Sequence, residues 1–168
     1  YGDVPLILAE TDASTYMPRT AVAEIYDQAI IPSLKKAVEI LPAKSRSGFS
    51  STPSKWAAEA CLAAAYMTMA GWPLKRGQEY YSLAAAAAKD IIDNSGLYLT
   101  EEYAELWKEA NKAQPNEVMF AIHHNAKMKT ASNYGKSYYP SEFAPNAGWS
   151  DYYANESFFL NYPDDAHK

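Results

Sequence analysis

Tyrosine and tryptophan are the residues in this sequence whose types and spacing most readily suggest a binding chemistry. The chain holds 14 Tyr and 4 Trp among its 168 residues, and many of them fall outside segments with helical or strand periodicity. Each ring offers a flat apolar face with a polar edge, which suits stacking on sugar rings as well as wet protein interfaces. Packing against the fold is the alternative, and we expect half or more of these rings simply to pack.

Carboxylates are numerous, but the sequence gives no reason to pair any two of them for acid–base catalysis. Hydrolysis of a glycosidic bond needs two carboxyl groups at a defined separation across the bond. Three of the candidates look like a solvated helix face, and the full set is Glu101, Glu102, Glu105, Asp151, Asp164 and Asp165. The sequence also contains no Gly-rich phosphate loop and no Ser nucleophile elbow. We therefore expect no enzymatic activity.

Metal-ligating residue types are present without a convincing pattern. His123 and His124 are neighbours on a predicted strand and would point to opposite faces, which is poor geometry for one metal ion. Asp164, Asp165 and His167 offer ligands for calcium or zinc, but a cap or turn role is more typical of such a cluster. The single cysteine, Cys61, falls on an apolar helix face, so a buried, inert thiol is expected. We predict neither a metal nor another cofactor.

Composition excludes two classes of partner. The net charge of -5 and the lack of a basic stripe argue against a nucleic-acid backbone. No apolar run approaches the roughly 18 residues of a membrane span. The sequence opens at YGDVPL without Met or a signal sequence, which reads like the middle of a longer protein, so we expect an internal fragment.

The elements that must position these residues are mostly helices, organised around residues 52–96. This stretch predicts two antiparallel helices joined by a turn at Gly71-Trp72-Pro73, with Thr52 as N-cap and Gly96 as the left-handed residue that ends the second helix. Alanine dominates the apolar positions, so the helix axes are expected to approach to about 8 Å. Larger apolar residues recur at helical steps, namely Leu62, Tyr66, Met69, Tyr80, Leu83, Ile91 and Ile92. Such an Ala-rich pair is typical of tetratricopeptide-type (TPR-like) hairpins.

Further elements are expected on both sides of this hairpin. A helix is predicted from Thr20 to Leu41, with a kink or break at Pro32. Thr100 is expected to cap a short helix, and the alternating segment 117–123 predicts a strand. Residues 125–153 form a long loop rich in Tyr, Asn, Ser, Gly and Pro, and Asn155 is expected to start a last short helix. We thus assign residues 1–124 to helices and strand, and residues 125–168 to a ligand-facing loop region.

Several segments resemble the SusD/RagB family of outer-membrane nutrient-binding lipoproteins. The resemblance covers essentially the whole chain in the right order, through YGDVPL, PRTAVAEIYDQAIIPSLKKAVEILP, TPSKWAAEACLAAAYMTMAGWP, IIDNSGLYL, EEYAELW, NEVMFAI and FFLNYPDDAHK. It implies a mostly α-helical fold of TPR-like hairpins, a SusD-like α-α superhelix. It also implies a non-catalytic protein held at the extracellular face of the outer membrane by a lipid anchor that lies outside this sequence. Such proteins capture glycans or oligosaccharides and act with a SusC-like TonB-dependent transporter.

The family's ligand contacts vary between members, so the glycan site must be predicted from physics. The long loop supplies stacking platforms in Tyr134, Tyr138, Tyr139 and Trp149, and hydrogen-bond partners in Asn133, Asn146 and Asp151. Trp72 in the hairpin turn is a second candidate platform. For each ring the alternative is a packing role, which is the stronger alternative for Trp72. A TPR-type scaffold that binds protein rather than sugar is the rival function.

Overall fold

The computed structural model describes residues 2–12, 16–108, 110–111, 117–130, 132, 134–142 and 148–163. The chain divides into two compact units, Tyr1–Ile122 and His123–Lys168, which we call the helical unit and the C-terminal unit. Helices account for the regular structure of the described residues, in agreement with the expected mostly α-helical fold. Within the described residues, none of the helices is long and apolar enough to cross a membrane.

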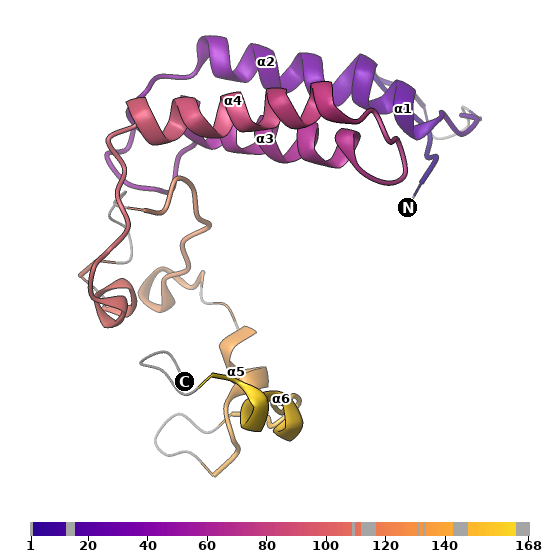
Figure 1. Ribbon diagram of the computed structural model, residues 1–168. Helices are drawn as coiled ribbons and strands as arrows, with labels where there is room; N and C mark the ends of the chain where they lie inside the picture. Colours follow the sequence, from indigo (N-terminus) through magenta and orange to yellow (C-terminus); the bar gives the residue numbers. More distant parts are fainter. Residues whose placement is uncertain are drawn as a thin grey trace. The chain divides into compact units, whose positions relative to one another are not determined.

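The first helical rod runs without a gap through the range expected for the first helix (Figure 1). Its three parts are α1 (Val22–Ile25), the π-helical segment η1 (Tyr26–Ile30) and α2 (Ile31–Ile40). Pro32 lies in the first turn of α2, where a missing N–H group is tolerated. In a regular α-helix its ring would clash with the carbonyl of Gln28. The interruption expected at Pro32 is thus a π-helical turn just before it, which is a usual way for a helix to absorb an irregularity.

Helices α3 (Lys55–Ala70) and α4 (Gln78–Asn94) form the expected hairpin, and α3 also packs against α2 (Figure 1). Gly96 ends the second helix as expected, with a left-handed φ of 71°. The expected N-cap at Thr52 is wrong, because α3 begins after Ser54. The Thr52 hydroxyl instead lies 2.5 Å from the Ser45 hydroxyl and 3.0 Å from that of Ser47, so it closes the preceding loop.

The turn between α3 and α4 is anchored at both of its sides. Arg76 N–H donates to the Met69 carbonyl at 3.0 Å and Gly77 N–H to the Ala70 carbonyl at 3.1 Å, which satisfies two carbonyls at the end of α3. The Arg76 guanidinium forms two hydrogen bonds to the Asp27 carboxylate, 2.8 and 2.5 Å long. This bidentate pair ties the turn to the first rod and holds the pKa of Asp27 below its ordinary value of 3.8.

The core lies where α3 meets α4 and the first rod. Met69 is completely buried, and the Tyr66 and Tyr80 rings meet edge to face with centroids 6.0 Å apart. The buried centre also contains Leu62 and Ala84, and the partly buried residues packed against it are Tyr26, Ile31, Leu34, Val38, Leu74 and Tyr80. The larger residues expected at the hairpin's apolar positions therefore supply most of this core.

Cys61 is exposed, contrary to the expectation of a buried thiol. The buried stripe of α3 follows steps of three and four residues through Ala58, Leu62, Ala65 and Met69, and position 61 falls off this stripe. An alanine-rich helix looks apolar on every side, so the sequence alone did not reveal which face is buried. Leu83 and Ile92 of α4 are exposed for the same reason, at 39% and 76%.

Residues 97–122 differ most from expectation in the helical unit. The expected helix is a short 3-10 helix, η2 (Tyr103–Trp107), and Thr100 does not cap it. The Thr100 N–H instead donates to Glu117 Oε2 at 2.7 Å. The strand expected at 117–123 is wrong, because the described residues contain no strand. The Ala121 N–H of this segment donates to the carbonyl of Ser50, in a loop, at 2.8 Å. A strand needs a partner, and alternation of side chains does not supply one.

The described part of the C-terminal unit contains three short helices, η3 (Ala126–Met128), α5 (Tyr134–Tyr138) and α6 (Glu156–Asn161). The expected loop at 125–153 is therefore partly helical. The last helix begins as expected, because the Asn155 side chain accepts a hydrogen bond from Phe158 N–H at 3.0 Å. None of these helices is long enough to be stable alone, so tertiary contacts must hold them.

Met69 provides a direct test of the core, with Met67 on the same helix as its control. We expect Met69→Ala to lower the free energy of unfolding by about 2–5 kcal/mol, because it leaves a cavity in a fully buried site. Met67 is 61% exposed, so Met67→Ala should change stability by about 0.5 kcal/mol or less. Urea unfolding followed by circular dichroism measures both values. Equal effects of the two substitutions would contradict the assigned core.

Glu59 is a buried carboxyl group between α3 and α4. It is 7% exposed, and its Oε2 atom is buried without a hydrogen-bond partner. Burial, followed by the nearby Asp90 carboxylate, raises the pKa of Glu59 above its ordinary value of 4.5, while Lys55 opposes the shift. Because the pKa of Glu59 is raised in the folded state, the folded state binds this proton more tightly than the unfolded state does. Protonation of Glu59 therefore stabilises the fold, and this contribution is complete at a pH below the unfolded-state pKa. It is lost as the pH rises through the folded-state value.

Glu59→Gln should therefore make the protein more stable than the wild type at pH 7, and this advantage should shrink toward pH 4. Glutamine keeps a neutral, hydrogen-bonding group at this position without the cost of a buried charge. Thermal unfolding between pH 4 and pH 8 measures the difference. Glu79→Gln, an exposed substitution in the first turn of α4, is the control whose curve should run nearly parallel to that of the wild type. If the stability of Glu59→Gln changed with pH in parallel with that of the wild type, the prediction would be contradicted.

Candidate functional site

Several aromatic residues of the C-terminal unit lie on two segments, residues 134–140 and 148–153, that are hydrogen-bonded to each other. Trp149 N–H donates to the Lys136 carbonyl at 2.7 Å, and Asp151 N–H donates to the Ser137 carbonyl at 3.0 Å. Ser150 N–H donates to the Tyr139 carbonyl at 3.1 Å. Residues 148–152 are thus held along α5 and the residues that follow it. Main-chain hydrogen bonds fix this register, so the side chains on both segments have defined neighbours.

Gly148 permits the close approach of these two segments. It is buried, and a Cβ atom at this position would lie 1.9 Å from the Tyr139 carbonyl oxygen. No side chain fits at that distance without a shift of the backbone. Ser150 follows with a φ of 54°, and its hydroxyl accepts a hydrogen bond from Ser141 N–H at 2.7 Å. The lack of a side chain at Gly148 and the hydrogen bond to the Ser150 hydroxyl therefore both reinforce the main-chain pairing.

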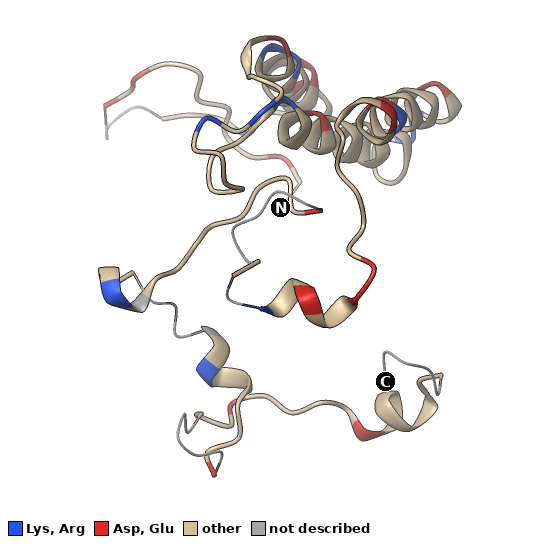
Figure 2. Ribbon diagram, turned by 90° about the vertical axis from the view of Figure 1, so that its left-hand side faces the viewer, with Lys and Arg blue, Asp and Glu red and all other residues tan. Residues whose placement is uncertain are grey.

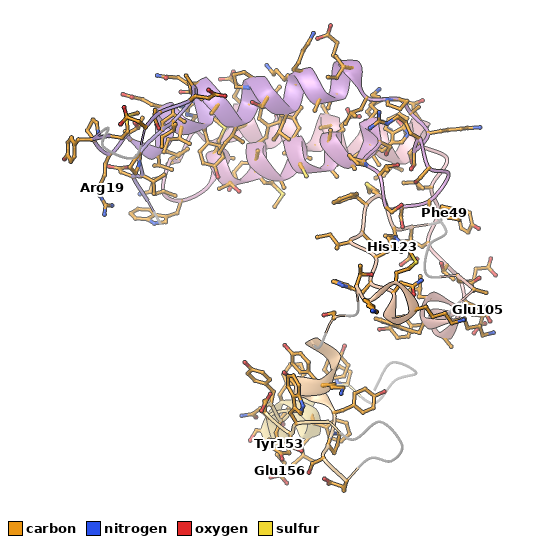
Figure 3. The ribbon with its side chains drawn as sticks, turned by 180° about the vertical axis from the view of Figure 1, so that it is seen from behind. Arg19, Phe49, Glu105, His123, Tyr153 and Glu156 are labelled. Atoms are coloured by element: carbon orange, nitrogen blue, oxygen red, sulfur yellow. The ribbon has the colours of Figure 1, made fainter. Side chains whose placement is uncertain are left out.

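We call the exposed aromatic residues of these two segments the aromatic cluster, made of Tyr138, Tyr139, Trp149, Tyr152 and Tyr153. Tyr138 and Tyr152 stack, with centroids 5.2 Å apart and an interplanar angle of 25°. The cluster is open to solvent, from 50% exposure at Tyr139 to 79% at Tyr153, the residue labelled in Figure 3. Exposed, oriented ring faces are what a sugar ring or a protein partner needs for stacking.

The structure brings together some of the predicted site residues. Tyr138, Tyr139 and Trp149 lie in the cluster, and exposed Asp151 is on the same segment as Trp149. The backbone of Tyr134 belongs to α5. Asn133 and Asn146 lie outside the described residues. Sequence reasoning missed Tyr152 and Tyr153, although the run Asp-Tyr-Tyr at 151–153 carries the same aromatic signal as the residues it selected.

Trp72 belongs to the helical unit, at the tip of the α3–α4 turn. It is 78% exposed, and the Lys75 ammonium lies 4.6 Å from the centroid of its ring. This cation–π contact occupies one approach to the indole and contributes roughly 0.5–1 kcal/mol at an exposed site. Trp72 is thus an accessible ring, but the aromatic cluster lies in the other unit.

The candidate carboxylates and histidines that the structure describes are not gathered into a metal site. Glu105 forms an ion pair with Lys108 and accepts a hydrogen bond from Asn111 at 3.1 Å, and the bond from Lys108 chiefly lowers the pKa of Glu105. Within the described part of the chain, no group of three or more His, Cys, Asp or Glu residues is placed to hold a metal ion. Asp164, Asp165 and His167 lie outside that part. Acidic and basic residues are interspersed over the helices (Figure 2).

Gly148→Ala should loosen the aromatic cluster, because the added methyl group forces residue 148 away from the Tyr139 carbonyl. We expect the amide protons of residues 149–152 to exchange with solvent about tenfold faster or more, as the local opening free energy falls. Hydrogen exchange followed by mass spectrometry measures this change. Gly135→Ala is the matched control in the same unit, since a Cβ atom there meets no atom within 4 Å. Unchanged exchange in Gly148→Ala would contradict the assigned packing.

Comparison with known proteins finds similarity to one family. The model of a SusD-like family, described as starch-binding and associating with the outer membrane, matches residues 1–67. A SusD-like protein of Bacteroides ovatus is 36% identical over 86 residues, which are 50% of this chain and 15% of that protein. The resemblance inferred from the sequence motifs is therefore confirmed.

Solved structures of SusD superfamily proteins have a similar fold. A SusD superfamily protein from Parabacteroides distasonis superposes with a TM-score of 0.84 at 24% identity, covering 96% of this chain and 35% of that one. A second one, from Bacteroides fragilis, superposes with a TM-score of 0.78 at 22% identity, covering 98% of this chain and 38% of that one. This chain thus spans little more than a third of those structures. The chain thus resembles part of a SusD-like protein, and the matching family model is described as starch-binding and associating with the outer membrane.

Proposed function

We propose that this protein captures glycans or oligosaccharides at the extracellular face of the outer membrane, and delivers them to a SusC-like TonB-dependent transporter without cleaving them. The description of the family as starch-binding and outer-membrane-associated supports the class of ligand and the location. The observation that carries the proposal for this chain is the aromatic cluster, whose rings are exposed yet fixed by main-chain hydrogen bonds.

Stacking is the main interaction that this cluster offers a glycan. A pyranose ring buries its C–H face on an aromatic ring, and each such contact contributes on the order of 1 kcal/mol by analogy with aromatic pairs. One contact gives negligible affinity, so several rings must act together. Because residues 148–152 are held along α5, the rings lose little freedom on binding, which preserves more of the contact energy.

Polar groups beside the rings would orient the sugar hydroxyls. Asp151 follows Trp149 by two residues on the same segment and is exposed. A carboxylate accepts hydrogen bonds from two hydroxyl groups of one sugar, and charged acceptors form the stronger bonds. The cluster thus combines apolar faces with at least one strong acceptor, the combination that carbohydrate recognition requires.

A protein-binding TPR-type scaffold is the alternative function, and the two functions differ in their dependence on salt. Stacking and hydrogen bonds to a neutral glycan are insensitive to ionic strength. Charged peptides in a helical groove are held partly by Coulomb attraction, which salt screens within about 8 Å at physiological strength. The exposed Met67 and Ile92 on the hairpin are the surface that such a scaffold would offer.

Substitution of two rings tests the proposed site. We expect Trp149→Ala combined with Tyr139→Ala to weaken binding of a soluble polysaccharide by about 10- to 30-fold, because two contacts of roughly 1 kcal/mol each are lost. Calorimetry and native affinity gels with a panel that includes soluble starch measure the loss. Trp107→Ala combined with Tyr98→Ala, at exposed rings of the helical unit, is the control that should bind like the wild type.

Three results would overturn parts of this proposal. Unchanged affinity of the Trp149/Tyr139 variant would show that the aromatic cluster is not the site. Release of shorter sugars from any polysaccharide by the pure protein would contradict a non-catalytic role. An affinity that falls steeply between 50 and 500 mM salt would favour the protein-binding scaffold.

A further inference from the structure

The helical unit contains a pocket of about 310 Å³ that is separate from the aromatic cluster. It lies at the end of the hairpin where α3 begins and α4 ends. Its walls come from the loop after α2, the start of α3, the residues after α4 and one residue of the 117–122 segment. The lining residues are Ala43, Lys44, Ser45, Gly48, Ser54, Trp56, Ser95, Gly96, Leu97 and Met119.

The pocket walls are anchored to one another. Lys55 N–H donates to the Pro42 carbonyl at 2.9 Å, which joins the loop after α2 to the start of α3. Ala121 N–H donates to the carbonyl of fully buried Ser50 at 2.8 Å, which holds the segment that carries Met119 against the same loop. The volume falls at the lower end of the range of small-molecule sites, about 300–1,000 Å³. The pocket is therefore preformed and suits one ring better than a long chain.

The hydrogen-bonding groups of the pocket both donate and accept. Ser54 is 6% exposed, lines the pocket, and makes no capping hydrogen bond to α3. The Ser95 hydroxyl accepts from Leu97 N–H at 3.1 Å and keeps its own proton to donate. The start of α3 and the residues just after α4 also border the pocket, so both serines lie at helix ends. A hydroxyl group, which donates and accepts at once, matches this set.

The remaining lining residues supply an apolar surface. Trp56, Leu97 and Met119 present ring, branched and thioether side chains, and Lys44 is the charged residue among the lining residues. The Lys55 ammonium lies 4.5 Å from the centroid of the Trp56 ring, so this indole is already held in place from one side. Among the described residues, none that lines the pocket is a carboxylate, so none of them repels an acidic substituent.

We propose that this pocket binds one sugar ring of a glycan, as a second contact site apart from the aromatic cluster. The C–H face of the sugar lies against the apolar residues of the pocket, and the hydroxyl groups of the sugar meet the serines and the helix ends. The inference rests on the proposed function, because it takes the ligand to be a glycan. It goes beyond that function by adding a site that directional hydrogen bonds, rather than stacking, would make selective.

Fluorine NMR of the protein labelled with 5-fluorotryptophan separates the two sites, because Trp56 lines the pocket and Trp149 lies in the aromatic cluster. The probe is maltoheptaose, a soluble fragment of starch. Signals are assigned with Trp72→Phe, Trp107→Phe and Trp149→Phe, which leaves Trp56 by elimination. We expect the Trp56 signal to shift saturably, and to do so still in the Trp149→Ala, Tyr139→Ala variant.

Two exposed positions provide the pocket variants. Ala43→Phe should fill the pocket and abolish the Trp56 shift, and Lys44→Met should weaken the response by about tenfold, the worth of one hydrogen bond from a charged donor. Lys35→Met, a substitution at an exposed position on α2, is the control that should leave the Trp56 response unchanged. Circular dichroism of Ala43→Phe checks that the variant is folded.

The outcomes distinguish the pocket from the wider function. A shift at Trp149 without one at Trp56 would overturn the pocket and leave the proposed function standing. A shift at Trp56 that persists in folded Ala43→Phe would also overturn the pocket as its source. No shift at either residue, together with no binding across the polysaccharide panel, would overturn both proposals.

Discussion

The packing of α3 against α4 is the constraint on which the helical unit depends. Small residues at the interface, such as buried Ala65, Ala84 and Ala87, let the two helices approach closely. The larger residues Tyr66 and Met69 then fill the space between this pair and the first rod. The first rod has no fully buried residue of its own, so the surface of the hairpin is what orders it. The hairpin therefore has to form for the rest of the unit to have a core.

The same antiparallel arrangement decides where polar groups remain available. At the turn end, Arg76 and Gly77 donate to the last carbonyls of α3, so little hydrogen-bonding capacity is left around exposed Trp72. At the open end, residues at the start of α3 and residues just after α4 line a pocket that includes Ser54 and Ser95. One end of the hairpin thus offers a ring face and the other offers an enclosed, hydrogen-bonding site.

The helical elements could be predicted from the sequence because their signals are local. Periodicity placed the first rod and the hairpin, and Gly96 and Asn155 marked a helix end and a helix start through their own conformation and side chain. The failures depend on distant partners. Thr52 closes a loop with Ser45 instead of capping, and Thr100 bonds Glu117, seventeen residues away. Alternation at 117–123 could not reveal that no neighbouring strand exists among the described residues.

The candidate site was predictable only in part for the same physical reason. Aromatic density selected Tyr138, Tyr139 and Trp149, but the stack of Tyr138 on Tyr152 follows from the register of two segments, which Gly148 alone makes possible.

The two proposed sites would recognise a glycan in different ways. Stacking tolerates many sugars, because every pyranose has a C–H face. A buried hydroxyl such as that of Ser54 instead discriminates against a ligand that leaves it unpaired. In the proposed function, the aromatic cluster would supply breadth and affinity, and the pocket would supply selectivity.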